Sequence, residues 1–277
     1  MQPETKKQAA TTGLPVSFSG AIAAVYEEIL GDFLFEPYAA NLVQRISLHA
    51  DARVLELACG TGRVTKKLLQ QLPASVQVIA TDLEADMIGV AKHNNNYPNL
   101  RWATVDMTDI PFATGQFDIV VCQFGLMLVP DKLKALEEMY RVLQPGGRLI
   151  FSVWGNINNN AVWRIAGEVL GTFLGINPMI QDPGPFSMND QQTLQWLKNT
   201  GFAHYNVTTV KLEGTIPTAA LAAKGFTNGL PVSLAINKKA PALLPQIEKA
   251  LEVELMKQLG NHPLQSPLQA WLFEAIK

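Results

Sequence analysis

The chain has 277 residues, which at roughly 100–200 residues per domain corresponds to one large domain or two small ones. Hydrophobic residues make up 48% of it and charged residues 17%, and the mean hydropathy is +0.09, so the chain is too apolar to be disordered. The 22 basic residues are scattered and are balanced by 24 acidic ones, with a net charge of −2. This distribution argues against a nucleic-acid groove.

Neither a disulfide framework, nor a metal site, nor a membrane span is predicted. Cys59 and Cys122 lie far apart, each in an apolar run typical of a buried thiol. The polar stretch from Met1 to Gly13 is not followed by the apolar segment of a signal peptide, and no stretch reaches the roughly 18 apolar residues of a membrane helix. We therefore expect a reduced, cytoplasmic protein without integral membrane association.

Short β-branched runs alternate with amphipathic segments between Arg53 and Trp154, which is the pattern of a parallel sheet built from βαβ units. The runs lack strict alternation of apolar and polar residues, as expected of strands covered by helices on both faces. The predicted strands are Val54–Leu57, Val76–Ala80, Leu100–Val105, Phe117–Gln123 and Arg148–Trp154. The predicted helices are Arg63–Leu72, Glu84–Asn94 and Lys132–Leu143, the last stopped by a turn over Gln144–Gly147.

The flanking stretches are predicted to be mainly helical. Before the core, apolar periodicity predicts a helix over Ile22–Leu30 that stops at Gly31, and a second helix from Pro37 to Ile46. After the core we expect an irregular stretch over Ile176–Ser187, helices over Ala161–Leu174, Ser187–Gly201, Pro217–Asn228 and Pro241–Leu259, and a strand over Val207–Leu212. The closing Leu268–Ile276 fits a strand or a helix.

No linker separates a second domain. We therefore expect one elaborated domain with three parts: N-terminal helices over residues 1–50 that contribute to a lid, an α/β core over residues 51–155, and lid insertions with closing strands over residues 156–277.

The most informative stretch is a strand that runs into a turn containing Gly60 and Gly62 and then into a helix. Such a turn lets a ligand approach the backbone closely at a helix N-terminus. Asp82 ends the next strand, 20 residues after Gly62, which is the spacing at which a carboxylate can accept hydrogen bonds from ribose hydroxyls. The pattern predicts a cofactor that carries a nucleoside.

Glu56, just before the turn, bears on the choice of cofactor. A carboxylate aimed into the site would repel the pyrophosphate of a dinucleotide, and Thr65 stands where the third glycine of the dinucleotide motif belongs. S-adenosylmethionine has no phosphate and carries an ammonium and a sulfonium group, for which Glu56 is a favourable partner. A nicotinamide-dependent oxidoreductase is the rival enzyme class.

At this point the sequence resembles the class I S-adenosylmethionine-dependent methyltransferases, particularly the small-molecule branch with ubiquinone/menaquinone-biosynthesis-like enzymes. The family fold is a Rossmann-like α/β sheet of seven mostly parallel strands, the last antiparallel, which favours a strand at Leu268–Ile276. Ala58 departs from the glycine of many members. The likeness covers about residues 35–155 and rests on Leu55–Gly62, Ala80–Leu83 with Met87, Asp106 and Met107 before Ile110–Phe112, Phe117–Val121, and Arg141–Leu149.

The resemblance implies a binding set for S-adenosylmethionine, whose product is S-adenosyl-L-homocysteine. Tyr38 is expected to close over the cofactor with Tyr26, Phe33 and Phe35, or to pack among the helices. The implied contacts are Glu56, Ala58 and Gly60 at the methionine end, Asp82 on the ribose hydroxyls, Leu83 and Met87 beside the adenine, Asp106 on its amino group, the Met107 N–H on a ring nitrogen, and Gln123 and Phe124 facing the methionine moiety and the methyl group.

The implied activity is methyl transfer to a small, apolar or aromatic acceptor by in-line displacement, driven mainly by positioning, which can supply on the order of 7–11 kcal/mol. No general base and no metal ligand set is identified, and the oligomeric state is not determined. Gln123–Leu126 replaces the Asn-Pro-Pro-Tyr motif of amine methylation, which disfavours nucleobase and protein-amide acceptors. The alternative is a protein that binds the cofactor without catalysis. Candidates for an acceptor pocket, or for the core, are Phe124, Trp154, Trp163, Phe173, Met179, Phe186 and Met188.

Overall fold

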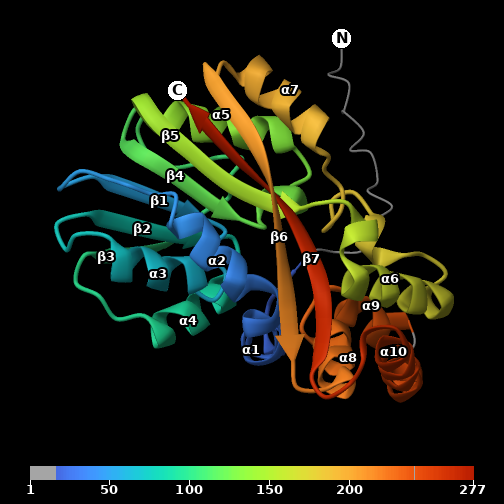
Figure 1. Ribbon diagram of the computed structural model, residues 1–277. Helices are drawn as coiled ribbons and strands as arrows, with labels where there is room; N and C mark the ends of the chain where they lie inside the picture. Colours follow the sequence, from blue (N-terminus) through green and yellow to red (C-terminus); the bar gives the residue numbers. More distant parts are fainter. Residues whose placement is uncertain (1–16, 240) are drawn as a thin grey trace, which may run out of the picture.

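The computed structural model describes residues 17–239 and 241–277, and its centre is one seven-stranded sheet (Figure 1). The strand order is β3-β2-β1-β4-β5-β7-β6, and β7 runs in the opposite direction to the other six strands. The predicted fold class is confirmed. The strands are β1 (Arg53–Leu57), β2 (Gln77–Asp82), β3 (Leu100–Thr104), β4 (Phe117–Gln123), β5 (Leu143–Trp154), β6 (His204–Ile216) and β7 (Leu264–Ile276). The predicted stretch Met1–Gly13 lies outside the described residues.

Helices cover both faces of the sheet, which explains why its central strands are apolar throughout. Leu55 of β1 and Val120 of β4 are paired in register and fully buried. Figure 1 shows α3 (Arg63–Gln71) and α4 (Ala85–Asn94) below the sheet, and α5 (Lys132–Val142) and α7 (Asp190–Thr200) above it. The predicted core helices are confirmed to within one residue at each end.

The segment between α5 and β5 differs in part from the prediction. The helix ends at Val142, as the proline and glycines after it predict. The chain then enters the strand at once: Leu143 pairs with Phe117 and Arg148 with Ile119, so residues 144–147 form a bulge inside β5 rather than a free turn. Gly146 takes the left-handed backbone that the bulge requires, with φ of 77°.

Strands β6 and β7 are longer than their apolar runs predict. They pair with each other from His204 and Ile276 to Ile216 and Leu264, whereas β5 pairs only with Ala270–Ile276. The remainder forms a two-stranded ribbon that leaves the sheet and runs down to α8 and α10 (Figure 1). Leu268–Ile276 is therefore a strand, and backbone pairing extends it through polar residues that composition alone did not assign.

Four helices after the core pack together beside this ribbon (Figure 1). The last of them, α10 (Leu244–Leu259), buries Ile247, Leu251 and Leu255 along one stripe, as its periodicity predicts. One member of the group, α9, was not predicted. The four are α6 (Ala161–Leu174), α8 (Ala219–Asn228), α9 (Val232–Lys239) and α10 (Leu244–Leu259); the single 3₁₀ turns are η2 (Leu126–Leu128), η3 (Ile157–Asn159), η4 (Pro178–Ile180) and η5 (Pro241–Leu243).

The N-terminal helices form one continuous helical run, α1 (Ala21–Val25), the π-helix η1 (Tyr26–Phe35) and α2 (Glu36–Val43). The predicted stop at Gly31 is wrong. The Arg63 guanidinium packs where a side chain at Gly31 would stand, so tertiary contact carries the helix through the glycine. Pro37 lies in the first turn of α2, as predicted.

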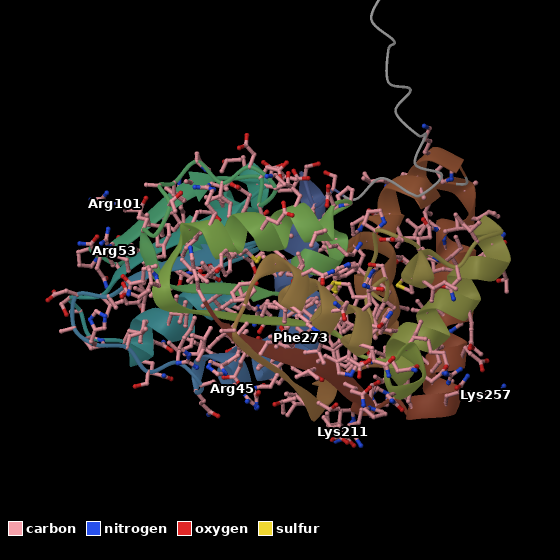
Figure 2. The ribbon with its side chains drawn as sticks, turned by 90° about the horizontal axis from the view of Figure 1, so that it is seen from above. Arg45, Arg53, Arg101, Lys211, Lys257 and Phe273 are labelled. Atoms are coloured by element: carbon pink, nitrogen blue, oxygen red, sulfur yellow. The ribbon has the colours of Figure 1, made fainter. Side chains whose placement is uncertain are left out.

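The charged residues labelled in Figure 2 lie toward the periphery of the molecule. Figure 2 shows Arg53 and Arg101 at one end of the molecule, Lys257 at the other, and Phe273 near its centre. Within residues 17–239 and 241–277, no helix is long and apolar enough to cross a bilayer, and no group of His, Cys, Asp and Glu side chains has the arrangement of a metal site. Cys59 and Cys122 are buried free thiols, and burial raises the pKa of Cys122 to about 12.

Candidate active site

A cavity of about 730 Å³ lies at the carboxyl ends of the parallel strands. This edge is where open α/β sheets bind ligands, because the chain reverses its strand order there. Its wall includes most of the predicted binding set, from four different strand ends: Ala58, Gly60, Asp82, Leu83, Met87, Asp106, Met107, Gln123 and Phe124.

The turn after β1 presents bare backbone to the cavity. Gly60 has a φ of 54°, and no atom lies within 4 Å of the place where a side chain would stand. Gly62 has a φ of 86° and has no such space, since an added Cβ would lie 2.6 Å from the Asn95 side chain. The first glycine therefore leaves room for a ligand, and the second allows close packing against the residues that follow α4.

Asp82 joins the turn to the next strand. One of its carboxylate oxygens accepts the Gly60 N–H at 2.8 Å and the other accepts the Glu84 N–H at 2.9 Å. Burial raises the pKa of Asp82, and these two hydrogen bonds oppose the rise. Asp106 is more exposed, and its Oδ1 accepts both the N–H and the hydroxyl of Thr108. Both carboxylates keep further lone pairs, so both can accept hydrogen bonds from a ligand.

Glu56 does not line the cavity, which corrects its predicted place in the wall. It is 2% exposed, and its Oε2 accepts the hydroxyl of Thr65, a buried residue of α3, at 2.6 Å. The side chain thus lies behind the glycine turn, between β1 and α3. Burial raises the pKa of Glu56 to about 8, and the negative charge of Asp82 adds to the rise.

This raised pKa predicts that the folded protein loses stability as pH increases. Below about pH 4.5 Glu56 is protonated in both the folded and the unfolded chain. Between about pH 4.5 and 8 the unfolded chain releases this proton while the folded chain keeps it, so the free energy of unfolding falls by on the order of 5 kcal/mol. Glu56→Gln should flatten this slope in urea titrations across that range. An unchanged slope in the variant would contradict the assignment.

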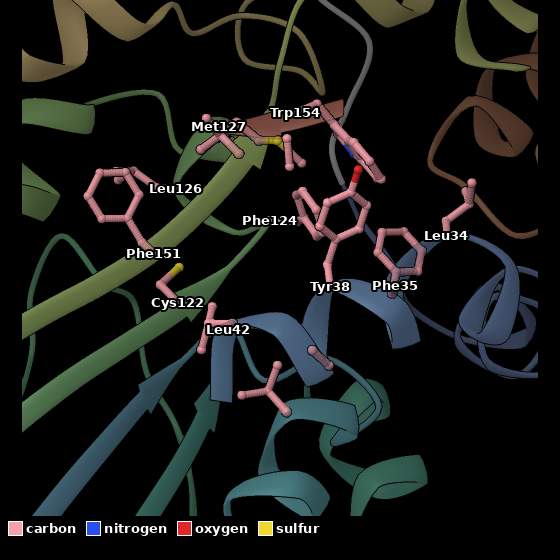
Figure 3. Close-up of a cluster of buried hydrophobic side chains, with 14 of the residues drawn as sticks. Leu34, Phe35, Tyr38, Leu42, Cys122, Phe124, Leu126, Met127, Phe151 and Trp154 are labelled. Atoms are coloured by element: carbon pink, nitrogen blue, oxygen red, sulfur yellow. The ribbon is translucent and has the colours of Figure 1, made fainter. Parts of the chain in front are cut away.

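Tyr38 also lies outside the wall, as expected from the alternative in which it packs among the helices. Figure 3 shows it rising from α2 between Phe124 and Phe35, with its hydroxyl directed toward Trp154. Its ring meets the rings of Phe124 and Trp154 edge-on at 5.3 and 5.4 Å. The hydroxyl is buried without a hydrogen-bond partner among the described residues, and burial raises its pKa. Tyr38 therefore supports the wall from behind.

Two of the other N-terminal aromatics do reach the cavity. Tyr26 and Phe35, at the two ends of η1, line it with their rings stacked at 4.6 Å. Phe18, which was not predicted, lines it as well and meets Tyr26 edge-on at 5.8 Å. Phe33 turns away from the cavity and packs at Gly214 of β6.

The remaining half of the cavity is apolar and aromatic. Of the predicted pocket residues, four line the cavity and three do not: Phe124, Trp154, Trp163 and Met179 line it, and Phe173, Phe186 and Met188 do not. The sequence analysis did not identify three short segments of the wall, residues 127–131, 183–185 and 230–232, which are far apart in the chain and meet only in the fold. Their shared signal was a high proline content. The described wall contains no lysine, arginine or histidine.

The comparisons with known proteins agree with this geometry. Residues 54–147 match the family described as a methyltransferase domain. A demethylmenaquinone methyltransferase of Paenarthrobacter aurescens is 32% identical over 187 residues, which cover 63% of this chain and 71% of that protein. A ubiquinone/menaquinone biosynthesis C-methyltransferase, UbiE, of Geobacter sp. is 35% identical over 112 residues, 39% of this chain and 48% of that protein. The chain thus spans about half the length of the first curated relatives it matches.

Solved structures share the fold. The YcgJ protein of Bacillus subtilis superposes with a TM-score of 0.58 at 18% identity, over 86% of this chain and 97% of that one. A second structure is phosphoethanolamine N-methyltransferase 2 of Haemonchus contortus in complex with phosphomonomethylethanolamine and S-adenosylhomocysteine. It superposes with a TM-score of 0.59 at 16% identity, over 92% of this chain and 56% of that one. With the sheet order, the glycine turn and the strand-end acids, these matches show that the chain belongs to the class I methyltransferases, the family that uses S-adenosylmethionine as methyl donor.

Proposed function

We propose that this protein transfers a methyl group from S-adenosylmethionine to a small, uncharged aromatic or apolar acceptor. The observation that carries the proposal is that a single cavity joins the glycine turn and strand-end acids to an aromatic half. The donor supplies an electrophilic methyl group on a sulfonium, which departs as a neutral thioether. The protein then has to bind both partners, align them and exclude water.

The residues at the polar end suit the donor. The open backbone at Gly60 has room for the methionine part, and the Asp82 carboxylate can accept from ribose hydroxyls. Leu83 is an apolar wall residue that is 61% exposed, so a flat ring placed on it would cover apolar surface. The Gln123 Oε1 is buried without a hydrogen-bond partner among the described residues, so it is available to accept a hydrogen bond from a ligand.

We assign the remaining predicted residues by their places in the same wall. Met87 and Met107 provide apolar contact beside the adenine, and Asp106 accepts from its amino group. Ala58 adjoins the methionine part, and Phe124 lies next to Gln123 at the end of β4. Glu56 supports the turn from behind through its hydrogen bond with Thr65, since it does not reach the wall. The N-terminal helices and the insertions after residue 155 complete the cavity as parts of one domain.

The wall also defines the kind of acceptor. Four carboxylates line the cavity, Asp82, Glu84, Asp106 and Asp131, and its described residues include no basic side chain to neutralise an acidic acceptor. A carboxylate or phosphate group would therefore be repelled and desolvated without compensation. The named relatives act in ubiquinone and menaquinone biosynthesis, and a neutral quinol-type ring fits the aromatic half of this cavity.

The test combines binding and turnover. Calorimetric titration with S-adenosylhomocysteine should give a dissociation constant in the micromolar range, which corresponds to a binding free energy of about −8 kcal/mol. NAD should not bind. With radiolabelled S-adenosylmethionine, 1,4-naphthohydroquinone should accept label at least tenfold faster than 1,4-dihydroxy-2-naphthoate, which differs by one carboxylate. Faster labelling of the carboxylate would overturn the neutral-acceptor proposal. Donor binding without transfer to any neutral aromatic acceptor would favour a protein that binds the donor without catalysis.

A further inference from the structure

The helical segment Tyr26–Glu36, here called the lid segment, carries an unbalanced charge. It contains the acidic residues Glu27, Glu28, Asp32 and Glu36 and no basic residue. One face of the segment is buried in the core through Leu30, Phe33 and Leu34. Its acidic side chains repel one another, so a basic group outside the segment is needed to balance them.

Most of this balance comes from Arg63, the first residue of α3, while Lys67 of the same helix pairs with Glu36 at 2.7 Å. The Arg63 Nε donates to the Glu27 Oε2 at 3.0 Å, and its Nη2 donates to the Glu27 Oε1 at 2.9 Å and to the Glu27 carbonyl at 3.1 Å. Its Nη1 donates to Asp32 at 2.6 Å and to Glu36 at 3.1 Å. These five bonds match the five N–H donors of a guanidinium, and the Arg63 side chain is only 14% exposed.

The same contact reaches the glycine turn. Arg63 directly follows Gly62, and the Thr61 hydroxyl, on the other side of Gly62, also donates to the Glu27 carboxylate. Glu27 is thus held by both neighbours of the second glycine. Next to it in the chain, Tyr26 lines the cavity and stacks on Phe35. Hydrogen bonds to Glu27 therefore join the glycine turn to the helix whose Tyr26 and Phe35 rings line the cavity.

Gly31 provides the space for these hydrogen bonds. A Cβ at this position would lie 2.0 Å from the Arg63 Nη2, so the guanidinium rests against the bare face of the helix. A side chain at Gly31 has to displace the guanidinium from this place, which disturbs its bonds to the lid segment. The helical glycine Gly89 of α4 is a matched control, because nothing lies within 4 Å of its added Cβ.

We propose that Arg63 and Glu27 are positioning residues that couple docking of the lid segment to occupancy of the donor site. A ligand that fixes the turn at Gly60 also fixes Thr61 and Arg63, and so favours the docked lid with Tyr26 and Phe35 against the cavity. Because such coupling is reciprocal, loss of lid docking lowers the affinity for the ligand by the same factor. This inference rests on the proposed function, because it takes the ligand at the turn to be the methyl donor.

Hydrogen exchange measured by mass spectrometry on the full chain tests the coupling, with S-adenosylhomocysteine as the probe. In the wild type and in Gly89→Ala, the ligand should slow exchange over residues 26–36 at least fivefold, together with residues 58–65. In Gly31→Ala this slowing over residues 26–36 should disappear, and the dissociation constant should rise about tenfold, as loss of one or two charge-assisted hydrogen bonds predicts.

The outcomes separate the two proposals. Protection of residues 58–65 without residues 26–36 in the wild type, or unchanged protection and affinity in Gly31→Ala, overturns the coupling and leaves the donor site standing. No binding and no protection in the wild type overturns the proposed function together with the coupling. Glu27→Gln is the second variant, used if Gly31→Ala fails to fold by circular dichroism. It removes the charge that Arg63 holds, and it should lose protection over residues 26–36 in the same way.

Discussion

Asp82→Asn should weaken the binding of S-adenosylhomocysteine about 100-fold, since each hydrogen bond from a ligand hydroxyl to a charged acceptor contributes about 1.5–3 kcal/mol. The Asp82 carboxylate already accepts the Gly60 and Glu84 N–H groups, one on each oxygen. An asparagine has a single accepting oxygen, so it must release one of these backbone groups as well as a ligand hydroxyl. The variant thus loses both direct contact and the shape of the turn.

Isothermal titration calorimetry measures this effect, with Asp109→Asn as the control. Asp109 is an exposed acid outside the cavity wall, and its replacement makes the same change in net charge. Circular dichroism must first show that Asp82→Asn is folded at the temperature of the titration, since an unsatisfied buried N–H costs about 1–3 kcal/mol. Wild-type affinity in a folded Asp82→Asn would remove Asp82 from the donor site.

Trp154→Ala should lower the free energy of unfolding by about 3–5 kcal/mol, the range for deletion of a buried aromatic side chain. Trp154 is fully buried and stacks on Phe124 at a ring distance of 4.1 Å, with Trp163 at 5.4 Å on another side. Its indole N–H has no hydrogen-bond partner among the described residues, so no hydrogen bond offsets the free-energy cost of burying this polar group. Trp154→Phe should therefore recover most of the loss. Urea unfolding of both variants measures the difference.

Tyr38→Phe is the companion variant, because it removes a second unpaired group from the same aromatic cluster. Its stability should equal or exceed that of the wild type by up to about 1 kcal/mol, as expected when a buried hydroxyl without a partner is removed. Equal losses in Trp154→Phe and Trp154→Ala, or a clear loss in Tyr38→Phe, would mean that these polar groups do have partners in solution. Weaker donor binding by Tyr38→Phe would restore the predicted role of Tyr38 at the cofactor.

Local sequence patterns predicted the α/β core and the polar end of the cavity. The apolar runs of β1 and β4 and the amphipathic helices between strands are short-range signals, because covering a sheet on both faces requires them. Gly60 and Asp82 were found for a similar reason: Gly60 lies in the turn after β1, Asp82 ends β2, and the carboxyl ends of parallel strands meet at one edge. Spacing along the chain therefore predicted their proximity.

Contacts between distant parts of the chain decided the course of the N-terminal helices, the length of the last two strands and the position of Tyr38. Gly31 should end a helix by local preference, but Arg63 packs against it and neutralises the acids around it, so the helix continues. The length of β6 and β7 follows from backbone pairing with each other, which depends little on side-chain type. Tyr38 lies behind the wall because Phe124 and Trp154 occupy the space in front of it. The sequence by itself determined which residues stand at strand ends. Only the tertiary structure decided which of them face the cavity, because that depends on packing between segments that the chain keeps far apart.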